Sequence, residues 1–240
     1  MDFKNKTILI TGASRGMGRA TAKKLYSLGC NVVGVYKSRD DMASSLLKEC
    51  PNILMIKGDI GQEETATRAV TQAVEKFGGL DALINNAGIN ILGDVVDYKL
   101  ADWEEMLRVD LTAKFLFVKY SIPHLKKSAD GNIINISSRL GMPEYVDSNS
   151  VPYGVVNAGT NILSIGLARE LQESGIRVNT VIPTVTDTDR FRDVFTSEEQ
   201  QRIIKKGKLG TAEEVAETIV GILKDGKKTG EMVIDPRVRL

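Results

Sequence analysis

A glycine-rich turn is the part of the sequence that most directly suggests chemistry. Gly12, Gly16 and Gly18 follow the apolar run Thr7–Ile10 and precede a stretch whose apolar residues have near-helical spacing. Glycines at such a junction permit a tight turn, and the free N–H groups at the start of the helix face an anion, typically the pyrophosphate of a dinucleotide. The alternative is a turn that merely packs the helix on the sheet. The expected contacts are Gly12, Ser14, Arg15, Gly16, Met17 and Gly18.

Basic residues follow the second expected strand, where an adenosine ribose would be recognised. An acidic residue at this place would bind a free 2′-hydroxyl, but the sequence reads Tyr36-Lys37-Ser38-Arg39. Lys37, Ser38 and Arg39, together with Arg15, could surround a 2′-phosphate with charge-assisted hydrogen bonds. The sequence therefore favours NADP(H) over NAD(H), although an ordinary solvated basic loop would have the same composition.

Strands and helices that must position these residues alternate along the chain. We expect strands at residues 7–10, 31–35, 53–56, 82–84, 133–136, 178–182 and 232–234. We expect helices after the glycine turn, at about 40–49 and 63–77, from about 101 to Pro123, and at about 153–173 and 212–224. The repeated alternation requires crossover connections. It predicts an α/β fold of the Rossmann type, a doubly wound parallel sheet of about seven strands with helices on both faces.

Chain length and composition indicate one domain with small partners. We expect residues 1–240 to form a single dinucleotide-binding domain, with a substrate loop at about 184–208 where the pattern loosens. The net charge of +1 gives no strong attraction for nucleic acid or an anionic membrane. No apolar stretch is long enough to span a membrane and no secretory core follows Met1, so a cytoplasmic location is expected. Cys30, Cys50 and the single His124 lack metal-site spacing, so no metal is expected.

A second motif extends the glycine turn into a family resemblance. Asn85-Asn86-Ala87-Gly88 directly follows the fourth expected strand. In combination with the turn it resembles the NNAG motif of the classical short-chain dehydrogenase/reductase family, and the similarity in element order covers essentially the whole chain. The opening most resembles the 3-oxoacyl-acyl-carrier-protein reductases. The resemblance implies that Asn86, Ala87 and Gly88 line the cofactor and that Asp59 and Ile60 contact the adenine, although Asp59 could equally start a helix.

The resemblance also implies a catalytic pair. Ser138 would hold the carbonyl oxygen of the substrate, while Tyr153 would donate its proton as a hydride arrives from the nicotinamide. Such a pair suits the chemistry, because hydride attack builds negative charge on the oxygen. The structural alternatives are a strand-end cap for Ser138 and a packed ring at the start of a helix for Tyr153. Pro183 and Thr188 would meet the nicotinamide carboxamide, unless Thr188 is only a helix cap.

Two positions depart from the family pattern. Asn157 stands where the family carries a lysine four residues after the tyrosine, and Asp110 stands where it commonly carries asparagine. Both changes should raise the pKa of Tyr153, since a cation about 5 Å from a phenolate is worth roughly 3 kcal/mol, or about two pKa units, at an effective dielectric constant near 20. A protonated Tyr153 could still serve reduction, and Asn157 could still bind a ribose hydroxyl of the cofactor.

Nearby cations could compensate for the missing lysine. Lys114 lies four residues after Asp110 and could pair with it on one helix face, although a solvated surface lysine is the simpler interpretation. Arg139 follows Ser138 and could recognise a carboxylate or phosphate on the substrate, or could have a plain surface role.

Three functional hypotheses result. The first is an NADP(H)-dependent oxidoreductase that reduces a small carbonyl compound, possibly anionic or carrier-bound, to an alcohol, at an impaired or specialised site. The second is a non-catalytic NADP(H)-binding protein of the same fold. The third is an enzyme that uses Asp110 for dehydration or epimerisation. The resemblance also implies a homo-oligomer, a dimer or a tetramer. Neither the substrate nor the direction of the reaction can be read from the sequence.

Overall fold

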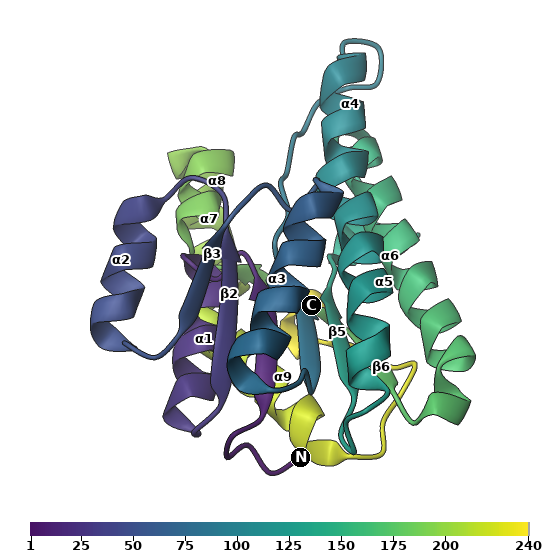
Figure 1. Cartoon of the computed structure of the whole chain (residues 1–240). Coiled ribbons are helices and arrows are strands. Elements are labelled where there is room, and N and C mark those ends of the chain that lie inside the picture. The colour runs from purple at the N-terminus through teal and green to yellow at the C-terminus, as the bar shows by residue number, and fades with distance from the viewer. Residues whose placement is uncertain (240) are drawn as a thin grey trace.

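A parallel sheet forms the centre of the molecule in the computed structural model, which describes residues 1–239 (Figure 1). Its strands are β1 (Thr7–Thr11), β2 (Asn31–Tyr36), β3 (Leu54–Lys57), β4 (Ala82–Asn85), β5 (Asn132–Ile136), β6 (Arg177–Ile182) and β9 (Met232–Ile234). They pair in the order β3-β2-β1-β4-β5-β6-β9, and every pair is parallel. The order reverses between β1 and β4, and such a reversal opens a crevice at the carboxyl ends of the strands.

Helices cover both faces of this sheet (Figure 1). They are α1 (Gly16–Ser27), α2 (Asp40–Glu49), α3 (Glu63–Phe77), α4 (Leu100–Met106), α5 (Ala113–Leu125), α6 (Val151–Glu170) and α9 (Ala212–Asp225). Successive β1 side chains alternate between the faces. Ile8 and Ile10 pack with Leu25 of α1 and Ile219 of α9, whereas Leu9 lies in the opposite core with residues of α3, α5 and α6. The predicted doubly wound α/β fold is confirmed.

The segment after β6 is more regular than the sequence indicates. Residues 184–208, expected as a loop, contain β7 (Val185–Thr186), α7 (Asp189–Val194) and α8 (Ser197–Lys205). Strand β7 pairs with β8 (Leu209–Gly210), and the Thr184 hydroxyl donates to the Lys208 carbonyl at 2.6 Å. These bonds hold the two ends of the segment together. Its expected role in binding substrate stays a prediction.

The helix expected from about residue 101 is interrupted without being broken. Between α4 and α5, residues Leu107–Thr112 form a π-helical segment, and α5 then passes through Pro123 to end at Leu125. π-helical turns occur frequently at functional sites, and this one carries Asp110. Among residues 1–239, no helix combines the length and apolar character needed to cross a membrane.

Candidate active site

Two adjoining cavities lie at the carboxyl ends of the strands. The larger, of about 360 Å³, is lined by the predicted residues Asp110, Ser138, Arg139, Tyr153, Asn157 and Pro183, among others. The smaller, of about 270 Å³, is lined by the predicted residues Gly12, Ser14, Arg15, Gly16, Lys37, Ser38, Arg39, Asp59 and Ile60, among others. The residues that line both are Met17, Asn86, Ala87, Gly88, Ile89, Thr188 and Arg190. The fold thus gathers the predicted site residues in one crevice, with Gly18 packed beneath it.

The glycine turn has the backbone shape that an anion cradle needs. Gly12 and Gly16 have φ angles of 71° and 53°, in the left-handed region that favours glycine. A Cβ atom on Gly18 would overlap the Gly12 carbonyl and lie 2.5 Å from Asn86 Nδ2. Helix α1 has no side-chain cap and no acidic residue in its first turn, whereas α2 and α3 each have two acidic residues there. Its N–H groups therefore suit a pyrophosphate.

Asn86 joins the ends of β1 and β4 beside this turn. Its Nδ2 donates to the Thr11 carbonyl at 2.9 Å, and the Thr11 hydroxyl accepts from the backbone N–H groups of Asn86 and Ala87 at 3.0 Å each. Deeper in the core, Asn85 Nδ2 donates to Asn135 Oδ1 at 2.9 Å. These bonds fix the switch point of the sheet.

The cations expected around a 2′-phosphate differ in their availability. Arg39 is held by two hydrogen bonds to Asp41, at 2.9 and 2.7 Å, and Lys37 Nζ lies 2.8 Å from Asp59 Oδ2. Arg15 is half-buried in the lining of the smaller cavity, and within the described chain no ion pair or hydrogen bond engages its guanidinium. Arg15 is therefore the cation most available to a ligand.

Asp59 is more firmly engaged than an adenine contact requires. Its carboxylate accepts two hydrogen bonds of 3.0 Å from Arg108, a partner that the sequence analysis did not identify. Burial acts to raise the pKa of Asp59, but the hydrogen bonds from Arg108, Lys37 and the Gly61 N–H hold this pKa well below its usual range. Helix α3 begins at Glu63 with Gln62 as its N-cap, so Asp59 does not start that helix. Asp59 instead anchors the wall of the smaller cavity.

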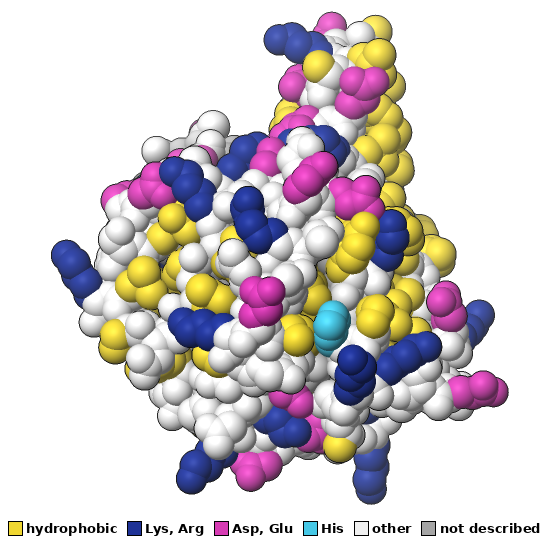
Figure 2. Space-filling model, viewed as in Figure 1, with side chains coloured by type: hydrophobic (Ala, Val, Ile, Leu, Met, Phe, Trp, Pro, Cys, Tyr) yellow, Lys and Arg dark blue, Asp and Glu magenta, His cyan; other side chains and the backbone are white. Residues whose placement is uncertain are grey.

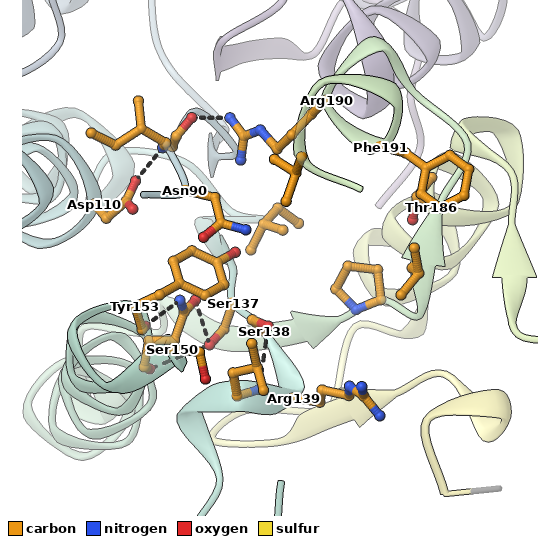
Figure 3. Close-up of a pocket in the computed structure, with 18 of the residues that line it drawn as sticks. Asn90, Asp110, Ser137, Ser138, Arg139, Ser150, Tyr153, Thr186, Arg190 and Phe191 are labelled. Atoms are coloured by element: carbon orange, nitrogen blue, oxygen red, sulfur yellow. Dashed lines mark hydrogen bonds between the residues drawn. The ribbon is translucent and has the colours of Figure 1, made fainter. Parts of the chain in front are cut away.

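Ser138 and Tyr153 come together in the larger cavity (Figure 3), and Asn157 lines the same cavity. Ser138 follows β5, and its hydroxyl accepts the Leu140 N–H at 3.3 Å, so it also caps a short 3-10 turn. Burial raises the pKa of the partly buried Tyr153, Arg190 acts to lower it and Asp110 acts to raise it. Asn157 Nδ2 donates to the Tyr153 carbonyl at 2.8 Å. The phenol of Tyr153 is therefore protonated at neutral pH.

Asp110 is buried behind the tip of β4. Its Oδ1 accepts the Ile89 N–H at 2.7 Å, while Oδ2 has no partner within the described chain. A Cβ on Gly88 would lie only 2.6 Å from Oδ1, so the glycine is what permits this approach. Burial raises the pKa of the Asp110 carboxyl, against the lowering effect of Lys114.

Arg190 of α7 is a site residue that the sequence analysis missed. It lines both cavities and donates a hydrogen bond to the Gly88 carbonyl (Figure 3). The N–H of the same peptide unit, on Ile89, bonds to Asp110, so one peptide is held from both sides. The only sequence signal was its position two residues after Thr188, which the resemblance had placed near the nicotinamide.

The remaining predicted residues have mixed outcomes. Lys114 is buried, with 5% of its surface exposed, so its interpretation as a solvated surface lysine is wrong. Arg139 lines the larger cavity, but its guanidinium points away from Tyr153 (Figure 3). Thr188 precedes α7 at the N-cap position without making a side-chain capping bond. No cluster of three or more His, Cys, Asp or Glu within residues 1–239 is arranged to hold a metal.

Known proteins resemble this chain over nearly its whole length. Residues 6–199 match the family described as short chain dehydrogenase. The chain is 34% identical to a 2,5-dichloro-2,5-cyclohexadiene-1,4-diol dehydrogenase of Sphingobium indicum, covering 93% of this chain and 90% of the relative. It is 32% identical to a 3-oxoacyl-[acyl-carrier-protein] reductase of Aquifex aeolicus, covering 96% of both. These relatives act on different substrates, so their similarity does not single out one substrate.

Solved structures agree with the sequence relatives. A short chain dehydrogenase from Burkholderia cenocepacia in complex with NADP has a TM-score of 0.92 and 28% identity, with complete coverage of both chains. A short-chain dehydrogenase/reductase from Serratia marcescens has a TM-score of 0.91 and 29% identity, with 98% coverage of both. Together with the glycine turn, the NNAG motif and the sheet order, these matches show that the chain belongs to the short-chain dehydrogenase family, whose members are NAD(P)-dependent oxidoreductases.

Proposed function

We propose that this protein is an NADP(H)-dependent oxidoreductase that reduces a carbonyl compound to an alcohol. The observation that carries the proposal is the convergence of Ser138 and Tyr153 on one cavity that adjoins the cavity of the glycine turn. A bound NADPH would supply the hydride. The Ser138 hydroxyl would hold the carbonyl oxygen, and the Tyr153 phenol would donate its proton to that oxygen as negative charge develops.

The state of Tyr153 favours reduction over oxidation. A general acid must be protonated before it acts, and burial raises the pKa of this phenol above its ordinary value near 10. The reverse reaction needs the phenolate as a base, which is scarce at neutral pH. The site therefore suits a reductase, and a slow or specialised one.

The smaller cavity supports a preference for NADP(H). Arg15 offers a guanidinium that has no hydrogen-bond or ion-pair partner among residues 1–239, and no carboxylate occupies residues 37–39 at the end of β2. The NADP complex of the Burkholderia cenocepacia protein, which matches this chain over its full length, supports the same preference. NADPH and NADH, added separately in a thermal-shift experiment, test it, because a ligand that binds the native state raises the melting temperature.

Arg15→Ala is expected to weaken NADPH binding about tenfold to a hundredfold, because a hydrogen bond to a charged group is worth about 1.5–3 kcal/mol. NADH binding should change less than about twofold in isothermal titration calorimetry, since NADH lacks the 2′-phosphate. Arg39→Ala is the matched comparison, and its effect should be smaller because Asp41 already holds that guanidinium. Equal losses for the two coenzymes in Arg15→Ala would mean that Arg15 contacts the shared pyrophosphate.

The test of the activity itself is turnover. Purified protein should oxidise NADPH when given a panel of ketones and aldehydes with neutral and anionic members, and Ser138→Ala should lose this activity.

Apolar side chains of the segment after β6, including Phe191 and Phe195, line the larger cavity and favour a substrate whose body is apolar. Arg139→Ala tests whether the site recognises an anionic group, since this change should weaken the binding of anionic substrates and leave the binding of neutral substrates unchanged. Tight NADPH binding without turnover would favour the non-catalytic alternative.

One observation favours the use of Asp110 as a base. Its Oδ2 has no hydrogen-bond partner in the described part of the chain, and burial raises the pKa of its carboxyl, as a proton acceptor at neutral pH requires. Substrate-dependent exchange of a solvent proton without consumption of NADPH would support this second function.

An apolar surface supports the proposed homo-oligomer. Phe115 of α5 and Val155 and Ile162 of α6 are 51%, 44% and 70% exposed. Figure 2 shows hydrophobic side chains gathered over the side of the molecule where α4 and α6 lie. Ile162→Glu should shift the protein toward a monomer in light scattering, while Ile204→Glu on α8 should leave its mass unchanged. An unaltered mass in Ile162→Glu would exclude this face as the interface.

A further inference from the structure

Asn90 is a polar side chain of the larger cavity whose amide oxygen has no partner in the described chain. It follows the Gly88–Ile89 peptide and lines the cavity together with Ser138 and Tyr153. Its Oδ1 is shielded from solvent, yet no donor within residues 1–239 bonds to it. Since a buried acceptor without a donor is costly, this oxygen suits a donor that a ligand brings.

The backbone on both sides of Asn90 is held in place. On one side, the Ile89 N–H donates to Asp110 Oδ1 at 2.7 Å. On the other side, the Tyr98 hydroxyl donates to the Ile91 carbonyl at 3.0 Å. A side chain presented from a fixed backbone suits recognition, because little ordering is needed when a ligand binds.

Many other polar side chains of this wall are already engaged within the protein. Those with hydrogen bonds of their own include Asn86, Ser137, Ser150, Asn157, Thr184 and Thr186. Among residues 1–239, Asp110 Oδ2 is the other buried side-chain atom of the wall without a partner, but Asp110 is only 3% exposed and lies behind the tip of β4. Asn90 therefore combines a shielded position with an unused amide oxygen.

The surroundings of Asn90 indicate what kind of group it could bind. Figure 3 shows its amide directed to the same part of the cavity as the phenol of Tyr153. A group held by Asn90 would therefore lie close to the carbonyl that this phenol protonates. A hydroxyl fits best, because it both donates and accepts and so satisfies an amide in either orientation. The remainder of the ligand would meet apolar side chains such as Leu92, Leu140 and Phe191.

We propose that Asn90 is a specificity-determining residue that binds a hydroxyl on the carbon next to the reacting carbonyl, so that the substrates are apolar α-hydroxyketones. The inference rests on the proposed reductase function. A hydride adds to the carbonyl carbon as NADPH is oxidised to NADP⁺, and the Tyr153 proton passes to the carbonyl oxygen. The phenolate then recovers a proton from solvent. The product is a vicinal diol, and the hydroxyl bound by Asn90 keeps its own bonds.

A matched pair of ketones tests the inference in the whole protein. Cyclohexanone and 2-hydroxycyclohexanone differ by one hydroxyl. Asn90→Leu should lower kcat/KM for 2-hydroxycyclohexanone about tenfold to a hundredfold, because the hydroxyl would lose its partner, and should change that for cyclohexanone less than about twofold. Asn52→Leu makes the same change at an exposed position before β3, outside both cavities, and should alter neither value. Asn90→Ala is measured in parallel, in case the leucine variant does not fold.

Two further readouts separate recognition from a structural role. Asn90→Leu should not lower the melting temperature, because Oδ1 makes no hydrogen bond within residues 1–239 that the fold would lose. In calorimetry with NADP⁺ present, the wild type should bind cyclohexane-1,2-diol more tightly than cyclohexanol, and Asn90→Leu should remove this difference. The binding measurement needs no turnover.

The possible outcomes decide between the roles of Asn90. Equal slowing of both ketones in folded Asn90 variants would overturn the inference. A large loss of NADPH binding would also overturn it, by assigning Asn90 to the cofactor. A wild-type protein that reduces no carbonyl would refute the proposed function, and the diol measurement would still decide whether Asn90 binds a hydroxyl.

Discussion

Tyr153→Phe is expected to lower the kcat for carbonyl reduction by about a thousandfold or more, while the Kd for NADPH changes less than about threefold. In the proposed mechanism this substitution removes the hydroxyl that protonates the carbonyl oxygen, and general acid catalysis contributes about a hundredfold to ten-thousandfold to such steps. The ring is kept, so the packing at the start of α6 is preserved. Single-turnover kinetics with NADPH and a carbonyl substrate, beside a direct binding titration, separate the two effects.

The pH dependence follows from the state of the same phenol. Tyr153 acts while protonated, so reduction should decline only as the pH rises through its pKa, which burial raises above its ordinary value. This group alone should therefore cause no fall in kcat between about pH 6 and pH 9. Tyr26→Phe makes the same chemical change on α1, away from both cavities, and should leave kcat unaltered. Retention of more than a tenth of the activity in Tyr153→Phe would require another acid, with Asp110 the first to test.

Most of the fold could be predicted because its sheet is buried on both faces. Short apolar runs alternate with segments whose apolar residues have helical spacing, and this alternation predicts a parallel sheet. Helices α2 and α3 have the boundaries that their patterns predict. The exceptions have local causes. Pro123 lies in the last turn of α5, and the helix continues to Leu125 beyond it. Helix α8 has no buried residue, so the sequence lacks the periodic apolar pattern that would predict it.

The candidate site could be predicted where its residues follow strand ends, and not where long-range partners matter. The sequence located the glycine turn by its place between a strand and a helix, and it located Ser138 and Tyr153 through the family resemblance of the segments that carry them. It could not reveal that Arg108 holds Asp59 or that Arg190 reaches Gly88, since each pair is joined only by the fold.

The burial of Lys114 was not predicted, for a further reason. The four-residue spacing suggested that Asp110 and Lys114 lie on one face of a regular α-helix. The π-helical segment that contains Asp110 has a wider turn, so the residues after it are rotated about the helix axis relative to that expectation. The bond that forms is from the ammonium to the Asp110 main-chain carbonyl. A single sequence offers no pattern for such a turn, and α5 is apolar enough that its buried face is poorly marked.

Gly18→Ala is expected to have the largest effect on stability, lowering the melting temperature by about 4–10 °C and abolishing measurable NADPH binding. The added Cβ would overlap the Gly12 carbonyl oxygen and lie 2.5 Å from Asn86 Nδ2. The Gly12 carbonyl is main chain at the turn, and Asn86 is bonded to the Thr11 carbonyl, so neither can withdraw without opening the switch point. Overpacking in a tight core costs about 1–3 kcal/mol, at roughly 2–4 °C per kcal/mol in a domain of this size.

Gly221→Ala is the matched control, because it makes the same change in the middle of α9, where a Cβ would meet nothing within 4 Å. It should stabilise the protein by up to about 1 kcal/mol, since alanine loses less conformational entropy in a helix than glycine does. Calorimetry should therefore show that the same added methyl group lowers the melting temperature in Gly18→Ala and raises it in Gly221→Ala. A melting temperature for Gly18→Ala equal to that of the wild type would mean that α1 can move away from β1. In that case the close approach of helix and strand would not be what shapes the anion cradle.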